Sequence, residues 1–331
     1  MNTATRLGAY ALGLAVVFGG TWGAGNLVGP PAGAAAPSAT AQGGHDMGSM
    51  NTTQTQAAKS DTPGGLQVSQ NGYTLNPLTA LKAGEPSDFR FTVTGPSGQP
   101  VTDYQVEHDK KLHFIVVSRD LGSFQHVHPE MAADGTWSVK LTLADPGAYR
   151  AFADFAPTGG DKVTLGADLL VAGDYQPKAL PQVSRTASVD GYTVNLSGDL
   201  VPGKASKLTL SVTKDGKPVT DLQPYLGAYG HLVALRAGDL AYLHVHPDGA
   251  PGDGKTKPGP EITFYAEVPS TGDYRLFLDF QHGDTVRTAD FTAKAQLSGQ
   301  SPAVTPSTTP TPTEKAEKAE KSDHDSTPHG H

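Results

Sequence analysis

Histidine is the residue type whose spacing in this 331-residue chain could do chemistry. Six of the twelve histidines form two copies of one pattern, H-x12-H-x-H-P. The copies consist of His113, His126 and His128, and of His231, His244 and His246. Groups of three neutral imidazoles suit Zn²⁺ or Cu²⁺, with copper favoured on intrinsic affinity. The chain has no cysteine, so thiolate ligands and disulfides are excluded. We therefore expect a copper or zinc ion bound by three histidines in each copy.

The spacing brings the three histidines of the first copy together if two strands form a hairpin. A short loop at 119–122 would pair Ser118 with Ser123 and, in the same register, His113 with His128. Residues two apart on a strand share a face, so His126 joins them. Cross-strand neighbours have Cβ atoms about 4.5–5.5 Å apart, which lets three imidazoles reach one ion. A one-residue slip would send His113 to the other face.

Carboxylates could complete such a site. Water, Asp154 or Asp279 could fill a fourth coordination position, although both aspartates could equally be hydrogen-bond acceptors at strand ends. A metal-bound imidazole usually has its second nitrogen held by a carboxylate or carbonyl. The candidates for that role are Glu107, Glu130 and Asp248.

A structural role is the alternative for these histidines. Histidine on a strand is often half-buried and hydrogen-bonded, and a duplication copies neutral features too. However, most other positions differ between the copies, whereas all three histidines and the following proline agree. His108 and His282 stand outside the two patterns, and His282 could add a ligand beside Asp279.

Both ends of the chain carry further metal-ligand types. The segment HDMGSM combines imidazole with two thioethers, a soft set that suits copper, and short His-rich tracts commonly bind metal. The residues concerned are His45, Met47 and Met50 near the start, and His324, His329 and His331 at the end. The alternative is a solvated polar tail.

An internal repeat organises the middle of the chain. HVHP at 126–129 matches HVHP at 244–247, and YRAFADF at 149–155 matches YRLFLDF at 274–280. The offset is 118 residues through the histidine pattern and 125 at the Tyr-Arg motif, which places seven extra residues in the loop starting at Asp248. The chain therefore contains a duplicated domain of about 110 residues.

Each copy has the pattern of an all-β fold. Segments 88–93, 112–118, 137–143 and 148–155 are β-rich or alternate with period two, and Gly- and Pro-bearing turns separate them. We expect two tandem immunoglobulin-like or cupredoxin-like β-sandwich domains. Alternating aromatic residues are expected to fill their cores: Trp137, Tyr149, Phe152, Phe155, Tyr274, Phe277 and Phe280.

Composition divides the chain into five parts. A transmembrane anchor or signal peptide is expected at 1–30, because Arg6 precedes an uncharged apolar stretch. The other parts are a disordered stalk at 31–64, β-sandwich repeats at 65–174 and 183–297, and a disordered His-containing tail at 298–331. An anchor would leave the repeats on the extracytoplasmic side of the cell membrane, and a cleaved signal would release a secreted protein.

Several functions are disfavoured. The net charge of −8 and the absence of a basic face argue against nucleic acid as a partner. We find no nucleophile motif, no phosphate-binding glycine loop and no general base beside the histidines, so we do not expect an enzyme.

The stretches LHFIVVSRDLGSFQHVHPE at 112–130 and YRAFADF resemble those of actinobacterial exported tandem β-sandwich proteins of unassigned function. They are also similar to the YtkA-like and CopC-like modules of extracytoplasmic metal handling. The histidines here lie in mid-domain rather than at a mature N-terminus, so no CopC-type ligands are carried over. The resemblance implies metal trafficking. From the histidine groups and the tails we expect a copper or zinc buffer, scavenger or delivery protein, and the candidate recipients of the ion are a membrane metal transporter or another exported protein. The alternative is a non-catalytic surface module that binds a protein or glycan.

Overall fold

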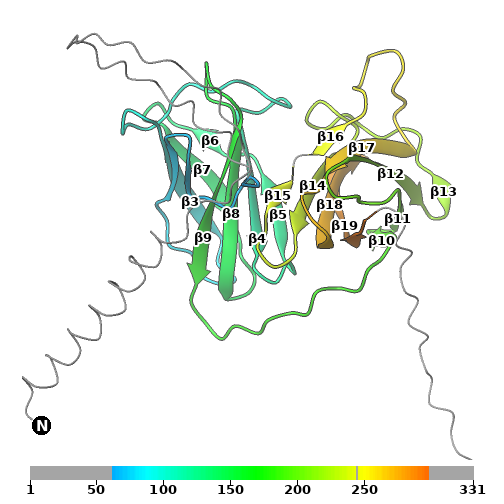
Figure 1. The fold of residues 1–331 in the computed structure, drawn as a ribbon, viewed down its shortest axis with the longest axis horizontal. Helices are drawn as coiled ribbons and strands as arrows, with labels where there is room; N and C mark the ends of the chain where they lie inside the picture. The colour runs from blue at the N-terminus through cyan, green and yellow to red at the C-terminus, as the bar shows by residue number, and fades with distance from the viewer. Residues whose placement is uncertain (1–61, 244, 298–331) are drawn as a thin grey trace, which may run out of the picture. The chain divides into compact units, whose positions relative to one another are not determined.

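The computed structural model describes residues 62–243 and 245–297, and its regular secondary structure there consists of antiparallel β-strands (Figure 1). The expected anchor at 1–30, most of the stalk and the tail at 298–331 lie outside the described residues. The structure shows no helix in its described part that has the length and apolar character to cross a membrane.

The first repeat is a sandwich of two sheets. One sheet has the order β1-β2-β3-β7-β6 and the other β5-β4-β8-β9. The strands are β1 (Ser69–Gln70), β2 (Tyr73–Pro77), β3 (Ser87–Thr94), β4 (Leu112–Ser118), β5 (Phe124–Val127), β6 (Glu130–Met131), β7 (Thr136–Leu141), β8 (Gly147–Phe155) and β9 (Val163–Val171). The four segments predicted as strands from the sequence thus form β3, β4, β7 and β8.

The second repeat has the same plan. Its sheets have the orders β10-β11-β12-β17-β16, with β13 paired to β12, and β15-β14-β18-β19. The strands are β10 (Thr186–Val189), β11 (Tyr192–Ser197), β12 (Ala205–Lys214), β13 (Lys217–Pro218), β14 (His231–Arg236), β15 (Tyr242–Leu243), β16 (Val245–Pro247), β17 (Glu261–Glu267), β18 (Gly272–His282) and β19 (Thr285–Ala295).

The strand order decides between the two predicted sandwich types. If β2, β3, β6 and β7 are strands A, B, D and E, one sheet has the immunoglobulin order A-B-E-D. The other sheet then has the order C′-C-F-G. Tyr149 near the start of β8 donates to the Asp145 carbonyl at 2.7 Å, and Tyr274 donates to Ser270 at 2.8 Å, which reproduces the tyrosine corner of that fold. Both repeats are therefore immunoglobulin-like.

Strand β4 is buried along its whole length, because both of its faces are covered. Leu112, Phe114 and Val116 point into the core of the first sandwich. Ile115 and Val117 point the other way, into a separate apolar cluster that also contains residues of the second repeat. This double burial explains why residues 114–117 (FIVV) are all apolar instead of alternating.

The apolar cluster between the repeats is built from equivalent faces of the two sandwiches. Phe124 stacks on Phe277 with ring centroids 4.0 Å apart, and Tyr242 lies 5.7 Å from Phe152. Tyr242 is the repeat-two equivalent of Phe124, and Phe277 is that of Phe152, at the offsets of 118 and 125. The same pair is therefore made twice with the repeats exchanged, as in an isologous dimer interface. Phe152 and Phe277 are buried as expected, but in this cluster rather than in a sandwich core.

The segment before β1 contacts both repeats. Gly64 accepts a hydrogen bond from Tyr242 N at 2.9 Å, and Gly65 N donates to the Thr164 carbonyl at 2.8 Å. A Cβ on Gly65 would lie 2.4 Å from the Phe152 ring, and its φ of +73° is also unfavourable for other residues. Glycine is therefore required at this position.

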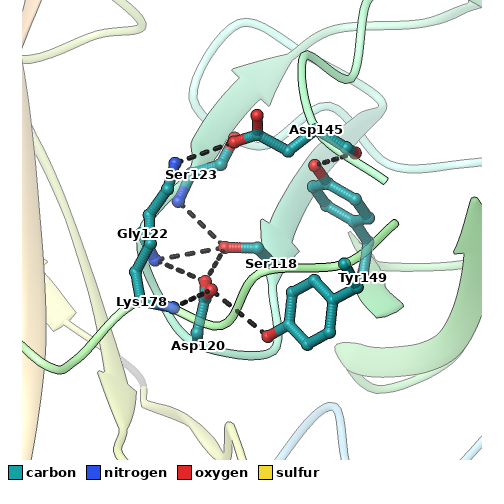
Figure 2. Close-up of polar contacts among 8 residues, drawn as sticks. Ser118, Asp120, Gly122, Ser123, Asp145, Tyr149 and Lys178 are labelled. Carbon is teal, nitrogen blue, oxygen red and sulfur yellow. Dashed lines mark hydrogen bonds and ion pairs between the residues drawn. The ribbon is translucent and has the colours of Figure 1, made fainter. Parts of the chain in front are cut away.

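The loop between β4 and β5 is fixed by Asp120 (Figure 2). Its Oδ1 accepts from the Ser118 hydroxyl at 2.6 Å and from Gly122 N at 3.0 Å. Its Oδ2 accepts from Lys178 N at 3.0 Å, and Lys178 Nζ pairs with Asp145 at 2.7 Å. Asp120 thus ties the hairpin loop to the linker at 172–185 that joins the two repeats.

Candidate metal centre

The hairpin of β4 and β5 has the register that the sequence predicts. Phe114 pairs with Val127 and Ile115 with His126, which continues from the contact of Ser118 N with Ser123 O. His113 lies on β4, His126 on β5, and His128 follows the end of β5. One ring nitrogen of each lies within 4.8 Å of the others. The structure therefore brings together the first three-histidine group.

His113 is oriented by the turn that precedes its strand. His113 Nε2 lies 3.1 Å from the backbone carbonyl of Glu107. His108 and Asp109, at the centre of this turn, have φ of 48° and 62°, as a type I′ turn requires. A carbonyl can only accept, so His113 Nε2 donates and Nδ1 of the neutral ring carries a lone pair.

His126 is oriented by a residue of the second repeat. His126 Nδ1 lies 2.8 Å from Oδ2 of Asp279 on β18, and both side chains are less than 5% exposed. The other carboxylate oxygen accepts from the Thr288 hydroxyl at 2.5 Å. His126 Nδ1 therefore donates to the carboxylate, and Nε2 of the neutral ring carries the lone pair.

These two constraints make two lone pairs face each other. His113 Nδ1 lies 3.3 Å from His126 Nε2. With both rings neutral this contact is repulsive, and it becomes favourable when a proton or a metal ion lies between the nitrogens. Two nitrogens bound to one tetrahedral zinc at about 2.0–2.1 Å are separated by about 3.3 Å. The spacing is therefore the one that a shared metal ion needs.

His128 supplies the third nitrogen. Its Nε2 is buried and has no hydrogen-bond partner in the described part of the chain. Its ring lies 4.8 Å from His126 and 5.2 Å from His113, centroid to centroid. A buried polar atom without a partner is costly, and a metal ion would satisfy it.

Burial favours the neutral form of His113 and His128. Desolvation, followed by repulsion from His126, lowers the pKa of His113 to about 4. Desolvation and repulsion from His126 and His113 lower the pKa of His128 to about 2. A metal ion competes with protons for these nitrogens, so a low pKa makes the ligands available at neutral pH.

Two more histidines lie beside the triad. The rings of His231 and His113 are stacked at 5.7 Å, and His108 lies 5.0 Å from His231. Burial lowers the pKa of His231 to about 3 and also lowers that of His108. A cavity of about 30 Å³ lies among His108, His113, His126 and His231, large enough for a water molecule.

The second histidine group is arranged differently. The β14–β15 hairpin keeps the equivalent register, with Ala234 opposite Leu243, and His231 Nε2 bonds the Leu226 carbonyl at 3.1 Å. However, β15 ends at Leu243, and the chain then joins the other sheet as β16. His246 lies there, exposed and opposite Tyr265. His244 lies outside the described residues. Of the described members of the second group, the structure thus places His231 beside the first triad and His246 on another sheet.

The carboxylates have distinct roles. Asp154 faces Lys162 at 3.1 Å and Thr164 at 2.8 Å, whereas its equivalent Asp279 holds His126. Glu107 orients His113 through its carbonyl, while its carboxylate pairs with Lys162.

Three other candidates lie elsewhere. Glu130 is on β6, Asp248 follows β16, and His282 bonds Tyr192 and Asp221. No sequence pattern predicts that His108 lies beside His231 or that Asp279 pairs with His126. Both contacts depend on how the two repeats pack.

The fold and the site together define a tandem immunoglobulin-like protein with a buried three-histidine group that could hold a metal ion. The chain belongs to the family described as domain of unknown function (DUF8832), which matches residues 67–172 and 187–296. Each of the two matched segments corresponds to one sandwich. No curated protein matches the chain.

Solved structures match with low identity. A Corynebacterium diphtheriae protein described as membrane-anchored is 10% identical over 70% of this chain, with a TM-score of 0.21, and the match spans 60% of that protein. The tandem Ig repeats of Dlar are 8% identical over 69% of this chain and 100% of theirs, with a TM-score of 0.19. Domains 5–6 of the S-layer protein SbsC are 12% identical over 67% of this chain and 100% of theirs, with a TM-score of 0.21. These comparisons add no support for a relationship to YtkA-like or CopC-like modules.

Proposed function

We propose that this protein binds Cu²⁺ or Zn²⁺ through His113, His126 and His128, and acts outside the cytoplasm as a metal buffer, scavenger or delivery protein. The observation that carries the proposal is the convergence of the three rings, with one nitrogen of each within 4.8 Å of the others. Two of the rings present lone pairs 3.3 Å apart, and the third, His128, has a buried nitrogen without a hydrogen-bond partner among the described residues. Nitrogen-only ligands in a group of three suit these two ions.

The cellular setting is part of the proposal. The apolar stretch after Arg6 would hold the chain at the membrane or direct its export. A membrane metal transporter or another exported protein would receive the ion. No catalysis is proposed, because the carboxylate nearest the triad, Asp279, is already bonded to His126 and Thr288.

Calorimetric titration of the full-length chain in mild detergent tests the proposal. We expect at least one site that binds Cu²⁺ or Zn²⁺ in the wild-type chain. Replacing His113, His126 and His128 together by alanine should abolish the tightest site. A matched variant with His324, His329 and His331 replaced by alanine should keep it, because those residues lie in the tail.

A single substitution protects the test against misfolding. His128→Ala removes a nitrogen that has no hydrogen-bond partner among residues 62–243 and 245–297, so the fold should survive, with affinity lowered at least tenfold. Circular dichroism checks the fold of each variant. Unchanged tight binding in the triple variant would refute the triad as the site and leave a tandem surface module.

A further inference from the structure

We infer that the metal site is shared between the two repeats, so that the second repeat sets the affinity of the first repeat's histidines and the bound ion holds the repeats together. This inference rests on the proposed metal-binding function and extends it. It assigns Asp279 as the positioning residue for His126 and places the His231 ring of the second repeat against His113 and His126.

Asp279 of the second repeat orients His126. Its Oδ2 is the hydrogen-bond partner of His126 Nδ1, at 2.8 Å, and it directs Nε2 toward His113. Carboxylate partners of this kind raise the basicity of a ligating imidazole and fix its tautomer, and their loss typically costs 10- to 100-fold in metal affinity. Asp279 belongs to β18, so the second repeat determines whether His126 can bind the ion.

The internal repeat provides a contrast. Asp154 occupies the equivalent position on β8, opposite His113 as Asp279 is opposite His231. Its oxygens face Lys162 and Thr164 instead of a histidine. The two aspartates are thus alike in sequence context and burial, yet only Asp279 holds a member of the triad in the described structure.

His231 of the second repeat lies against the first triad. Its ring stacks on His113 and lies 6.0 Å from His126, and its Nε2 bonds the Leu226 carbonyl. The neutral ring therefore has its lone pair on Nδ1. Three histidines leave one position of a tetrahedral ion open, and His231 is the described histidine of the second repeat whose ring lies against both His113 and His126.

The apolar cluster between the repeats holds the two halves of the proposed metal site close to each other. Phe124 from the hairpin that bears His126 stacks on Phe277, two residues before Asp279 on β18. The contact that docks the repeats therefore also sets the distance between His126 and Asp279. An ion that strengthens the His126–Asp279 pair stabilises the docked arrangement by thermodynamic linkage.

The test compares two variants of the full-length chain by titration with Zn²⁺. Asp279→Asn should weaken binding at least tenfold, whereas Asp154→Asn should change it less than threefold. The ¹⁵N shifts of the His126 ring report which nitrogen carries the proton. In the metal-free wild type Nδ1 should carry it, and in Asp279→Asn the proton should move toward Nε2.

Hydrogen exchange tests the docking. Zn²⁺ should protect amides of β14 and β18 in the wild type as well as those of β4 and β5. His231→Ala should lose the protection of β14, whereas His282→Ala, a histidine bonded to Tyr192 and Asp221, should keep it.

The outcomes separate this inference from the proposed function. Tight binding in the wild type that is unchanged in Asp279→Asn would overturn the shared site and leave the triad as a one-repeat site. Equal weakening by Asp279→Asn and Asp154→Asn would also overturn it, because general negative charge would then be the cause. Absence of binding in the wild type would refute the proposed function itself.

Discussion

At the scale of single residues, the chemistry of the site follows from what each imidazole faces. A carbonyl fixes His113, a carboxylate fixes His126, and nothing in the described residues occupies His128 Nε2. Each contact removes one of the two tautomers, so the ligating nitrogens are selected before any ion arrives. The arrangement is therefore preorganised for a cation, and the metal-free chain bears the cost of burying unprotonated rings.

That cost predicts how stability depends on pH. The pKa values of His113, His231 and His128 fall to about 4, 3 and 2 in the folded chain, against about 6.5 in an unfolded one. Below pH 6.5 the unfolded chain binds protons that the folded chain does not, so the free energy of unfolding decreases on acidification. The loss should begin near pH 6.5 and remain steep down to about pH 4.

Urea denaturation in EDTA at pH 7.5, 6.0 and 5.0 measures this effect. Each proton taken up only by the unfolded chain contributes about 1.4 kcal/mol per pH unit. His128→Gln should reduce the slope between pH 6.0 and 5.0 by about one proton, whatever it does to absolute stability. An unchanged slope would contradict the assignment of His128 as a buried neutral ring.

At the scale of elements, the β4–β5 hairpin is the unit that builds the site. Its register follows from the loop length, and the loop is held by Asp120. Burial acts to raise the pKa of Asp120, but hydrogen bonds from Ser118, Lys178, Gly122 and Tyr175 outweigh it and lower the pKa. The loop is thus fixed by a charged acceptor with four donors.

Asp120→Ala should therefore destabilise the hairpin. Hydrogen bonds to charged groups contribute about 1.5–3 kcal/mol each, and solvent exposure of this loop favours the lower end. We expect a loss of about 1–3 kcal/mol in chemical denaturation and faster hydrogen exchange in β5. Asp174→Ala, an exposed aspartate of the linker, is the control. Equal effects of the two substitutions would show that Asp120 does not lock the loop.

The sequence was sufficient to predict the register of this hairpin and of its counterpart, but not the end of the counterpart at Leu243. Period two and a short loop determine that His113, His126 and His128 share a face, and the structure has that register. The same argument applied to His231 and His246 does not account for the chain leaving its sheet after Leu243. Both repeats carry the same HVHP motif at this point, so the motif does not predict which of them changes sheet. The change depends on how each sheet edge packs.

At the scale of the whole molecule, the duplication produces one interface as well as two domains. The contacts between Phe124 and Phe277 and between Tyr242 and Phe152 are the same contact made twice. Pattern analysis detects the repeat and each strand, but the cross-repeat pairing of His126 with Asp279 involves residues 153 apart in sequence. A contact between residues this far apart leaves no local signal in one sequence, because it depends on how the two repeats pack.

The shared interface predicts that the two repeats unfold together. Ile115, Val117, Val233 and Leu235 are less than 4% exposed only because the sandwiches cover each other, so separating them exposes apolar surface. Calorimetry of the wild-type chain should show one transition for the described repeats.

Phe277→Ala should remove about 3–5 kcal/mol, the range for a buried phenylalanine, and separate the transition into two. Saturating Zn²⁺ at one hundred times its dissociation constant adds about 2.7 kcal/mol to the docked state, and it should merge the two transitions again if the ion lies between the repeats. Two transitions in the wild type, or no effect of Zn²⁺ on their separation in Phe277→Ala, would show that the repeats fold independently and that the ion does not link them.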